Sequence, residues 1–211
     1  WDNIENTSLN YQFGLASDGI ANTEIVDGSL SINSKSNGFF SIVHDPWRPV
    51  QSDGGHLGKT PGLFDRKQTD QRLDVAVFQT HFLKEIIHLS GIPILYTSIE
   101  SDQESFDVCL ALSLIDKTEK IVRQFSTGFL RVNKAIKDLE SDYVIKFHPT
   151  NISILKEHKL RLSIAASAWP AIGVNSGYCS KIFGNTSMDY KLTTLNFNLS
   201  KTIMKINPFF N

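Results

Sequence analysis

The chain has 211 residues, of which 41% are hydrophobic and 20% charged, and its formal net charge is −1. This apolar content is typical of a folded globule rather than a disordered chain, and an all-β domain of this size commonly has one core. We therefore expect residues 1–211 to form a single domain. Because Lys and Arg are scattered along a nearly neutral chain, we predict neither nucleic acid nor a membrane as a partner.

The ends of the chain and its cysteines suggest where it works. No apolar run reaches the roughly 20 residues that a membrane helix needs, and the first residues lack the basic and apolar regions of a secretory signal. The chain begins at Trp1 within a polar stretch, so we expect a fragment of a longer protein. Cys109 and Cys179 suit two free thiols in a reducing compartment, which predicts a cytoplasmic location.

Apolar residues alternate with polar ones along much of the chain, as in half-buried strands. The pattern is clearest at residues 159–168, and at 107–114 both faces are nearly apolar, which predicts a central strand. Further strands are expected at residues 11–15, 29–32, 39–43, 74–79, 85–89, 94–99, 121–131, 143–147, 192–198 and 203–206. Short helical turns fit only 134–139 and 152–156. The spacing favours an all-β, mostly antiparallel jelly-roll β-sandwich.

One long irregular segment, residues 45–71, interrupts this pattern and is rich in proline and glycine. Loops of this length inside a compact domain are usually functional or disordered. Because the segment also contains aromatic residues and opposite charges, we expect it to be ordered and to form an interface.

Short motifs in and after this segment follow a characteristic order. They read Asp45-Pro46-Trp47-Arg48-Pro49-Val50, Gly54-Gly55-His56-Leu57, Asp65-Arg66, Arg72-Leu73-Asp74-Val75-Ala76-Val77-Phe78, Phe147-His148-Pro149-Thr150 and His158-Lys159-Leu160-Arg161-Leu162. In this order they resemble the C-terminal domain of the serine hydrolases grouped as Xaa-Pro dipeptidyl-peptidases and cocaine-esterase/NonD acyl esterases. The likeness spans nearly the whole chain. One departure is Glu157, which stands where this family usually has glycine before the histidine.

The resemblance implies a galactose-binding-like jelly roll that packs on an upstream α/β-hydrolase domain of the same polypeptide. That catalytic domain would carry the Ser, Asp and His and bind a small ester or peptide substrate. The chain itself has no Gly-x-Ser-x-Gly elbow, the turn that presents a hydrolase nucleophile, so we expect it to be inactive alone. Its role would be that of a non-catalytic C-terminal domain that shapes the substrate cleft.

By the same resemblance, individual residues acquire expected roles. The substrate cleft would be lined by Gly54, Gly55, His56 and Leu57. The domain interface would include Asp45, Pro46, Trp47, Asp65, Arg66 and Arg72.

The residues themselves leave some alternatives to weigh. Opposite charges crowd at Asp65, Arg66, Asp70, Arg72 and Asp74; an Arg–carboxylate clamp is favoured over acid–base chemistry because Arg does not titrate near neutral pH. A triad of Ser52, Asp53 and His56 is disfavoured because no strand–turn–helix elbow surrounds the serine. The six histidines include no metal-ligand spacing, so we predict no metal and no cofactor.

Two other functions compete with the non-catalytic hydrolase domain. A free-standing carbohydrate-binding jelly roll could use an aromatic platform, for which Trp47, Trp169, Tyr178 and Phe183 are the candidates, although packing is favoured for them. A complete enzyme in 211 residues is disfavoured by the missing nucleophile motif. A second copy could also cover the docking face, so a homo-oligomer stays an alternative.

Overall fold

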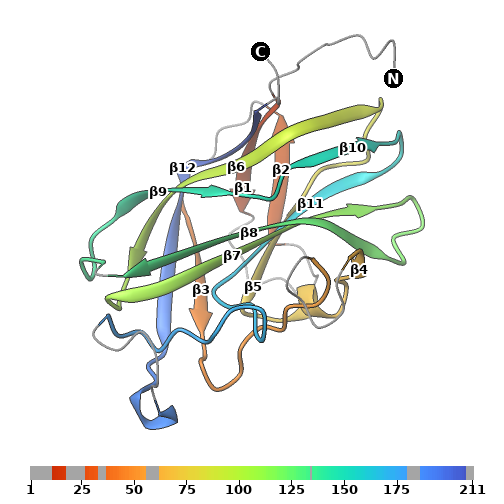
Figure 1. Ribbon diagram of the computed structural model, residues 1–211. Coiled ribbons are helices and arrows are strands. Elements are labelled where there is room, and N and C mark those ends of the chain that lie inside the picture. Colours follow the sequence, from red (N-terminus) through yellow and green to blue (C-terminus); the bar gives the residue numbers. More distant parts are fainter. Residues whose placement is uncertain are drawn as a thin grey trace.

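The computed structural model describes residues 11–17, 27–32, 37–55, 62–133, 135–179 and 186–207. These residues form strands and two short 3-10 helices, shown in Figure 1. The elements are β1 (Tyr11–Ser17), β2 (Gly28–Ile32), β3 (Phe39–His44), β4 (Phe64–Asp65), η1 (Thr69–Gln71), β5 (Val75–Gln79), β6 (Ile87–Ser101), β7 (Ser105–Ile115), β8 (Val122–Asn133), β9 (Ser141–Lys146), β10 (Thr150–Ile154), β11 (Lys159–Ala165), η2 (Ser187–Asp189) and β12 (Thr193–Asn207).

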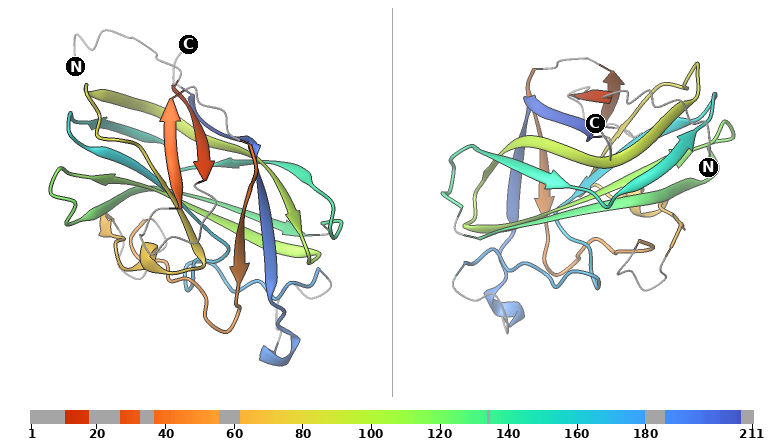
Figure 2. Two further views of the ribbon diagram at one scale, coloured as in Figure 1. Left: turned by 180° about the vertical axis from the view of Figure 1, so that it is seen from behind. Right: turned by 45° about the horizontal axis from the view of Figure 1, so that its top comes forward.

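The strands form one hydrogen-bonded sheet that folds over itself into two layers (Figures 1 and 2). Its path runs β10-β6-β12-β1-β2-β5-β11-β7-β8-β4, with β3 beside β12 and β9 beside β6. We call β5, β11, β7 and β8 the β7 layer. The opposite layer contains β6, β12, β3 and β9. Aromatic contacts cross between the layers, because Phe40 of β3 meets Phe78 of β5 with ring centroids 5.0 Å apart.

The two layers are joined by short connections rather than standing as separate sheets. Strands β2 and β5 pair in parallel through two residue pairs, whereas the other pairs among the described strands are antiparallel. On the other side an isolated bridge joins Gly128 of β8 to Phe147 just after β9. The predicted all-β sandwich is thus confirmed. Its jelly-roll connectivity stays a prediction.

Strand β7 confirms the central strand predicted at residues 107–114, since it lies between β11 and β8. Its residues Val108, Leu110 and Leu112 point into the core, where the largest fully buried side chains include Phe78 and Phe197. Truncating one such side chain to alanine typically costs about 2–5 kcal/mol of stability. The opposite face of β7 is also buried, and covering loops, not a third layer of strands, bury it.

The structure corrects four expectations about the elements. Strand β6 is continuous, although two strands were predicted. Pro93 has no N–H for a ladder hydrogen bond, and the strand tolerates it because it lies where the neighbour of β6 changes from β10 to β9. Strand β12 is likewise continuous, with a register shift between Asn198 and Ile203 where its partner changes from β3 to β1. The helical turn predicted at 152–156 is wrong, since 150–154 form β10 against β6. The helical turn at 134–139 is wrong too: residues 135–139 form a turn without helix, and residue 134 lies outside the described residues.

Candidate functional site

Two loops cover the outer face of the β7 layer. We call residues 45–55 and 62–74 the first covering loop and residues 166–179 the second; Figures 1 and 2 show both along the same side of β7 and β8. They are joined to each other by backbone hydrogen bonds, from Ser52 N to Trp169 O at 2.7 Å and from Trp169 N to Val50 O at 2.9 Å. Beneath them a small apolar cluster of Val50, Val75, Val77 and Ala165 anchors the loops to the sheet.

A pocket of about 100 Å³ lies between the covering loops and the sheet. Strands β7 and β8 supply its base with Cys109, Gln124 and Gly128, and Phe129 lies at the half-open rim. The predicted cleft residues Gly54 and Gly55 are in its lining. His56 and Leu57 lie outside the described residues, and the role of all four in a substrate cleft stays a prediction.

Glycine is required at the pocket wall for two separate reasons. Gly54 has φ +68°, a left-handed conformation, and a Cβ added there would lie 2.5 Å from Cβ of Phe64 and 2.8 Å from the carbonyl oxygen of Gly62. Gly55 is also left-handed, with φ +69°. Only glycine adopts this backbone conformation without cost, so the Gly-Gly pair lets the loop pass close to β4.

A buried polar network holds the pocket wall in place. The Arg66 guanidinium donates from Nε to Asp70 Oδ1 at 2.8 Å and from Nη1 to Gln124 Oε1 at 3.0 Å. The amide of Gln124 in turn donates to the carbonyl of Asp53 at 3.0 Å. Arg161 of β11 reaches the other oxygen of Asp70 at 3.1 Å. The network therefore ties the Gly-Gly segment to residues 66–70 of the same loop and to the sheet below.

The charged residues named from the sequence divide into different roles. Asp65 does not pair with Arg66; its carboxylate accepts hydrogen bonds from the backbone N–H groups of Lys67 and Val122. Arg72 instead forms a two-pronged pair with Asp74, at 2.8 and 2.7 Å, and also donates to the carbonyl of Arg48. Sequence reasoning counted Asp70 in the charge cluster but did not name it as a site residue.

The turn that opens the first covering loop contains the remaining predicted interface residues. Asp45 accepts a hydrogen bond from Trp47 N at 3.0 Å, and Pro46 is buried. The Trp47 ring packs edge-on against Tyr190 with centroids 5.7 Å apart, yet 53% of this residue remains exposed.

A second buried network, which the sequence reasoning missed, fixes the other covering loop. Asp107 of β7 binds Arg131 of β8 through two hydrogen bonds of 2.8 and 2.7 Å, and it accepts another from Asn175 at 2.9 Å. Arg131 also donates to the carbonyl of Gly173. The hydrogen bond with Asp107 raises the pKa of Arg131. The available signal was a single carboxylate on a nearly apolar strand face, since such a group needs a buried partner.

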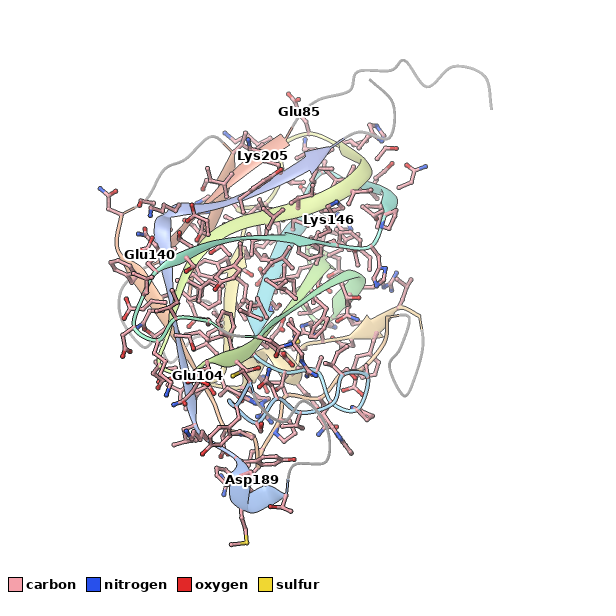
Figure 3. The ribbon with its side chains drawn as sticks, turned by 60° about the vertical axis from the view of Figure 1, so that its left-hand side comes forward. Glu85, Glu104, Glu140, Lys146, Asp189 and Lys205 are labelled. Atoms are coloured by element: carbon pink, nitrogen blue, oxygen red, sulfur yellow. The ribbon has the colours of Figure 1, made fainter. Side chains whose placement is uncertain are left out.

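Most charged side chains lie at the periphery, which makes these buried carboxylates exceptional. Figure 3 shows Glu85 and Lys205 at one end of the sandwich and Asp189 at the opposite end. By contrast, Asp70 and Asp107 are 2% and 1% exposed. Both act as the centre of a hydrogen-bond network beneath a covering loop.

Burial shifts the pKa of two titratable side chains near the loops toward the neutral form. Burial lowers the pKa of His44, whose Nε2 has no partner in the described part of the chain, against the opposing effect of Asp107. Burial also raises the pKa of the Cys109 thiol at the base of the pocket. Ser52 Oγ accepts a hydrogen bond from the N–H of Ala171 at 3.1 Å.

The described residues offer neither a cluster of metal ligands nor a membrane-spanning helix. No group of three or more His, Cys, Asp or Glu side chains gathers there in a way that could hold a metal ion. Among the same residues, none of the helices is both long and apolar enough to cross a membrane.

One family model matches most of the chain. The family model of the X-Pro dipeptidyl-peptidase C-terminal non-catalytic domain matches residues 5–182. The chain belongs to this family. Members of this domain family are non-catalytic by description, which fits a site that presents a pocket and loops without a nucleophile motif.

Solved structures with the same fold are parts of larger hydrolases. An aminopeptidase from the marine sediment archaeon Thaumarchaeota archaeon matches with a TM-score of 0.76 and 17% identity, over 93% of this chain and 37% of that one. An α-amino acid ester hydrolase matches with a TM-score of 0.78 and 17% identity, over 94% and 36%. A CocE/NonD family hydrolase from Staphylococcus aureus matches with a TM-score of 0.59 and 12% identity, over 95% and 37%.

At these identities the likeness establishes the fold alone, and the chain spans only 36% to 37% of the length of those proteins. A comparison with curated protein sequences finds no match.

Proposed function

We propose that this chain is the C-terminal domain of a serine hydrolase of the dipeptidyl-peptidase or acyl-esterase type. Its covering loops would pack on an α/β-hydrolase domain of the same polypeptide and narrow the substrate cleft. The observation that carries the proposal is the outer surface of these loops, where large apolar side chains are exposed on a domain of a non-catalytic family.

Four exposed apolar side chains on the covering loops support this docking surface. Their exposed fractions are 53% for Trp47, 67% for Leu63, 101% for Leu73 and 45% for Trp169. Trp47 and Leu73 belong to segments joined by the Arg72–Arg48 hydrogen bond, and Trp169 pairs with Gln51, so three of the four lie on connected backbone. Grouped apolar side chains of this size, aromatic ones in particular, are typical of interfaces rather than of solvated surface.

The division of labour follows from what the chain contains. Bond cleavage would occur by acyl transfer through a serine and an oxyanion hole in the hydrolase domain. This chain would supply shape, with the rigid Gly54–Gly55 wall turned toward the cleft. Its own Ser52 is engaged by the backbone of the second covering loop. Cys109 and Cys179 do not form a disulfide, which supports a cytoplasmic location for the whole protein.

Hydrogen exchange tests the docking surface. In the full natural polypeptide, the backbone around Trp47, Leu73 and Trp169 should be protected relative to the 211-residue chain, whereas the turn at Leu155 should exchange equally in both. Replacing Leu73 by serine should weaken the activity of the full polypeptide, and Leu155→Ser, which changes an exposed leucine elsewhere, should not. Equal exchange at the covering loops would refute the docking role.

Activity measurements on the isolated chain separate the competing functions. It should hydrolyse neither p-nitrophenyl acetate nor Ala-Pro-p-nitroanilide; turnover that Ser52→Ala abolishes would show a complete enzyme instead. Quenching of tryptophan fluorescence by a simple sugar would favour the carbohydrate-binding module. A dimer that Leu73→Ser dissociates would show that a second copy covers this surface.

A further inference from the structure

The network at the pocket wall contains more positive than negative charge. Arg66 and Arg161 both bind Asp70, and the side chains of the three are 9%, 8% and 0% exposed. Within this network, two guanidinium groups against one carboxylate leave one positive charge in excess, before the Asp53 side chain in the pocket lining is counted. Among the described residues no other carboxylate forms a salt bridge with either arginine. The other side chains that bind them are the neutral amides of Gln124 and Gln79.

The excess charge also has unused hydrogen-bond donors. Arg66 donates through Nε and Nη1, while its Nη2 has no hydrogen-bond partner in the described part of the chain. Arg161 Nε is buried without a partner there as well. A guanidinium group is always charged and offers donors in a planar fork that matches a carboxylate. Since Arg66 lines the pocket, its open donor is the natural contact for a ligand in that space.

The rest of the lining combines polar side chains, among them Gln51, Ser52 and Thr127, with an apolar part. Phe129, Ala168, Ala171 and Ile172 form that apolar part, and the Cys109 thiol adds no negative charge because burial keeps it protonated. An anion that lies against these apolar side chains is screened by water less than in bulk solution, which strengthens its attraction to the Arg66 guanidinium. A doubly charged phosphate would exceed the single compensating charge and gain nothing from the apolar wall.

We propose that this pocket binds a small carboxylate whose acid group pairs with Arg66 and whose short apolar body lies against Phe129 and Ile172. A pocket of about 100 Å³ is smaller than the roughly 150 Å³ cavity that accepts benzene, so it suits acids with few carbon atoms. The site does not depend on the proposed docking role, since all of its residues belong to this chain.

Asp53 is the acidic residue in the described lining, and it opposes the ligand. Its backbone carbonyl holds Gln124 in position, which a change of side chain leaves intact. Asp53→Asn should therefore tighten carboxylate binding severalfold. A site for cations would respond in the opposite direction, so this one variant distinguishes the two kinds of ligand.

Calorimetric titration of the 211-residue chain with butyrate and with butyramide tests the proposal. Butyrate should bind with a Kd on the order of 1 mM, as expected for a ligand of this size, and the neutral amide at least about tenfold more weakly. Equal affinity for the two compounds, or no binding of butyrate, would overturn the proposal.

Two variants test the proposal without replacing Arg66, whose buried ion pair with Asp70 would be lost on substitution. Gln79→Glu keeps the acceptor for Arg161 and neutralises the excess charge from outside the pocket, so butyrate binding should fall about tenfold. Ala171→Leu fills the pocket and should abolish binding with the charges unchanged. The proposal is wrong if butyrate binds both variants as tightly as it binds the original chain.

The same titration on the full natural polypeptide identifies the source of the carboxylate. Binding to both proteins supports a free acid. If butyrate binds the isolated chain but not the full protein, the carboxylate site is also supported. An acidic side chain of the other domain then fills the site in the full protein. Equal exchange at the covering loops, which would refute docking, would leave the first of these results intact and would exclude the second.

Discussion

Two Asp–Arg pairs with the same geometry but different burial allow a direct test of what fixes the covering loops. Asp107–Arg131 and Asp74–Arg72 each have hydrogen bonds of 2.8 and 2.7 Å between the same atoms. The side chain of Asp107 is 1% exposed, whereas that of Asp74 is 17% exposed. Removing one partner of a buried pair costs about 3–5 kcal/mol, because the other charge stays buried without compensation. A more exposed pair contributes about 1 kcal/mol or less.

We therefore expect Asp107→Asn to lower the free energy of unfolding by about 3–5 kcal/mol, and Asp74→Asn by about 1 kcal/mol. For a chain of this length the first change corresponds to a fall in Tm of roughly 6–20 °C. Urea titrations followed by circular dichroism measure both variants, and an unchanged slope would show that the denatured state is unaffected. Equal losses in the two variants would refute the argument from burial.

Three more variants test local features. Gly54→Ala should lower the free energy of unfolding by about 2 kcal/mol or more, because the backbone is left-handed and the new Cβ would meet Phe64. Gly173→Ala should leave it unchanged, because no atom lies within 4 Å of the added Cβ; urea titrations measure both. Glu157 has a left-handed backbone with φ +62°, so Glu157→Gly should raise the free energy of unfolding by up to about 1 kcal/mol. Lys156→Gly, next to it, should lower the free energy of unfolding. Burial lowers the pKa of His44, so as the pH drops the unfolded state binds a proton before the folded state does. Stability should therefore fall as the pH drops below 6.5 toward the pKa of the folded state. In thermal melts, His44→Gln should make the dependence of Tm on pH flatter.

The strands themselves could be predicted because they depend on local alternation. The strand predicted at residues 107–114 matches β7 to within two residues at each end. At 159–168 the predicted strand runs past the end of β11 at Ala165, because Ser167 leaves the sheet to accept a hydrogen bond from Val50 N. Alternation cannot distinguish a side chain buried by a neighbouring strand from one buried by a loop.

The Arg–carboxylate clamp predicted in the charge cluster forms between Arg66 and Asp70 and between Arg72 and Asp74, but the rest of the polar networks could not be predicted, because those partners are far apart in the sequence. Asp70 and Arg161 are separated by 91 positions, and Asp107 and Asn175 by 68. Short-range spacing pairs Asp65 with Arg66, yet the backbone direction places Arg66 toward Asp70 one turn later. A charged residue on an otherwise apolar strand face was the usable signal, and it marks the need for a partner without naming it.

The buried carboxylates have a consequence for how the covering loops could serve a neighbouring domain. Replacing such pairs by apolar residues is often neutral for stability, so net stability does not explain them. Hydrogen bonds of fixed direction do, however, restrict the path of a loop more than apolar contacts, which tolerate sliding. Loops fixed in this way lose little conformational entropy when a partner docks, which leaves more of the apolar contact energy for association. The rigid Gly54–Gly55 wall is therefore set before any partner or ligand arrives.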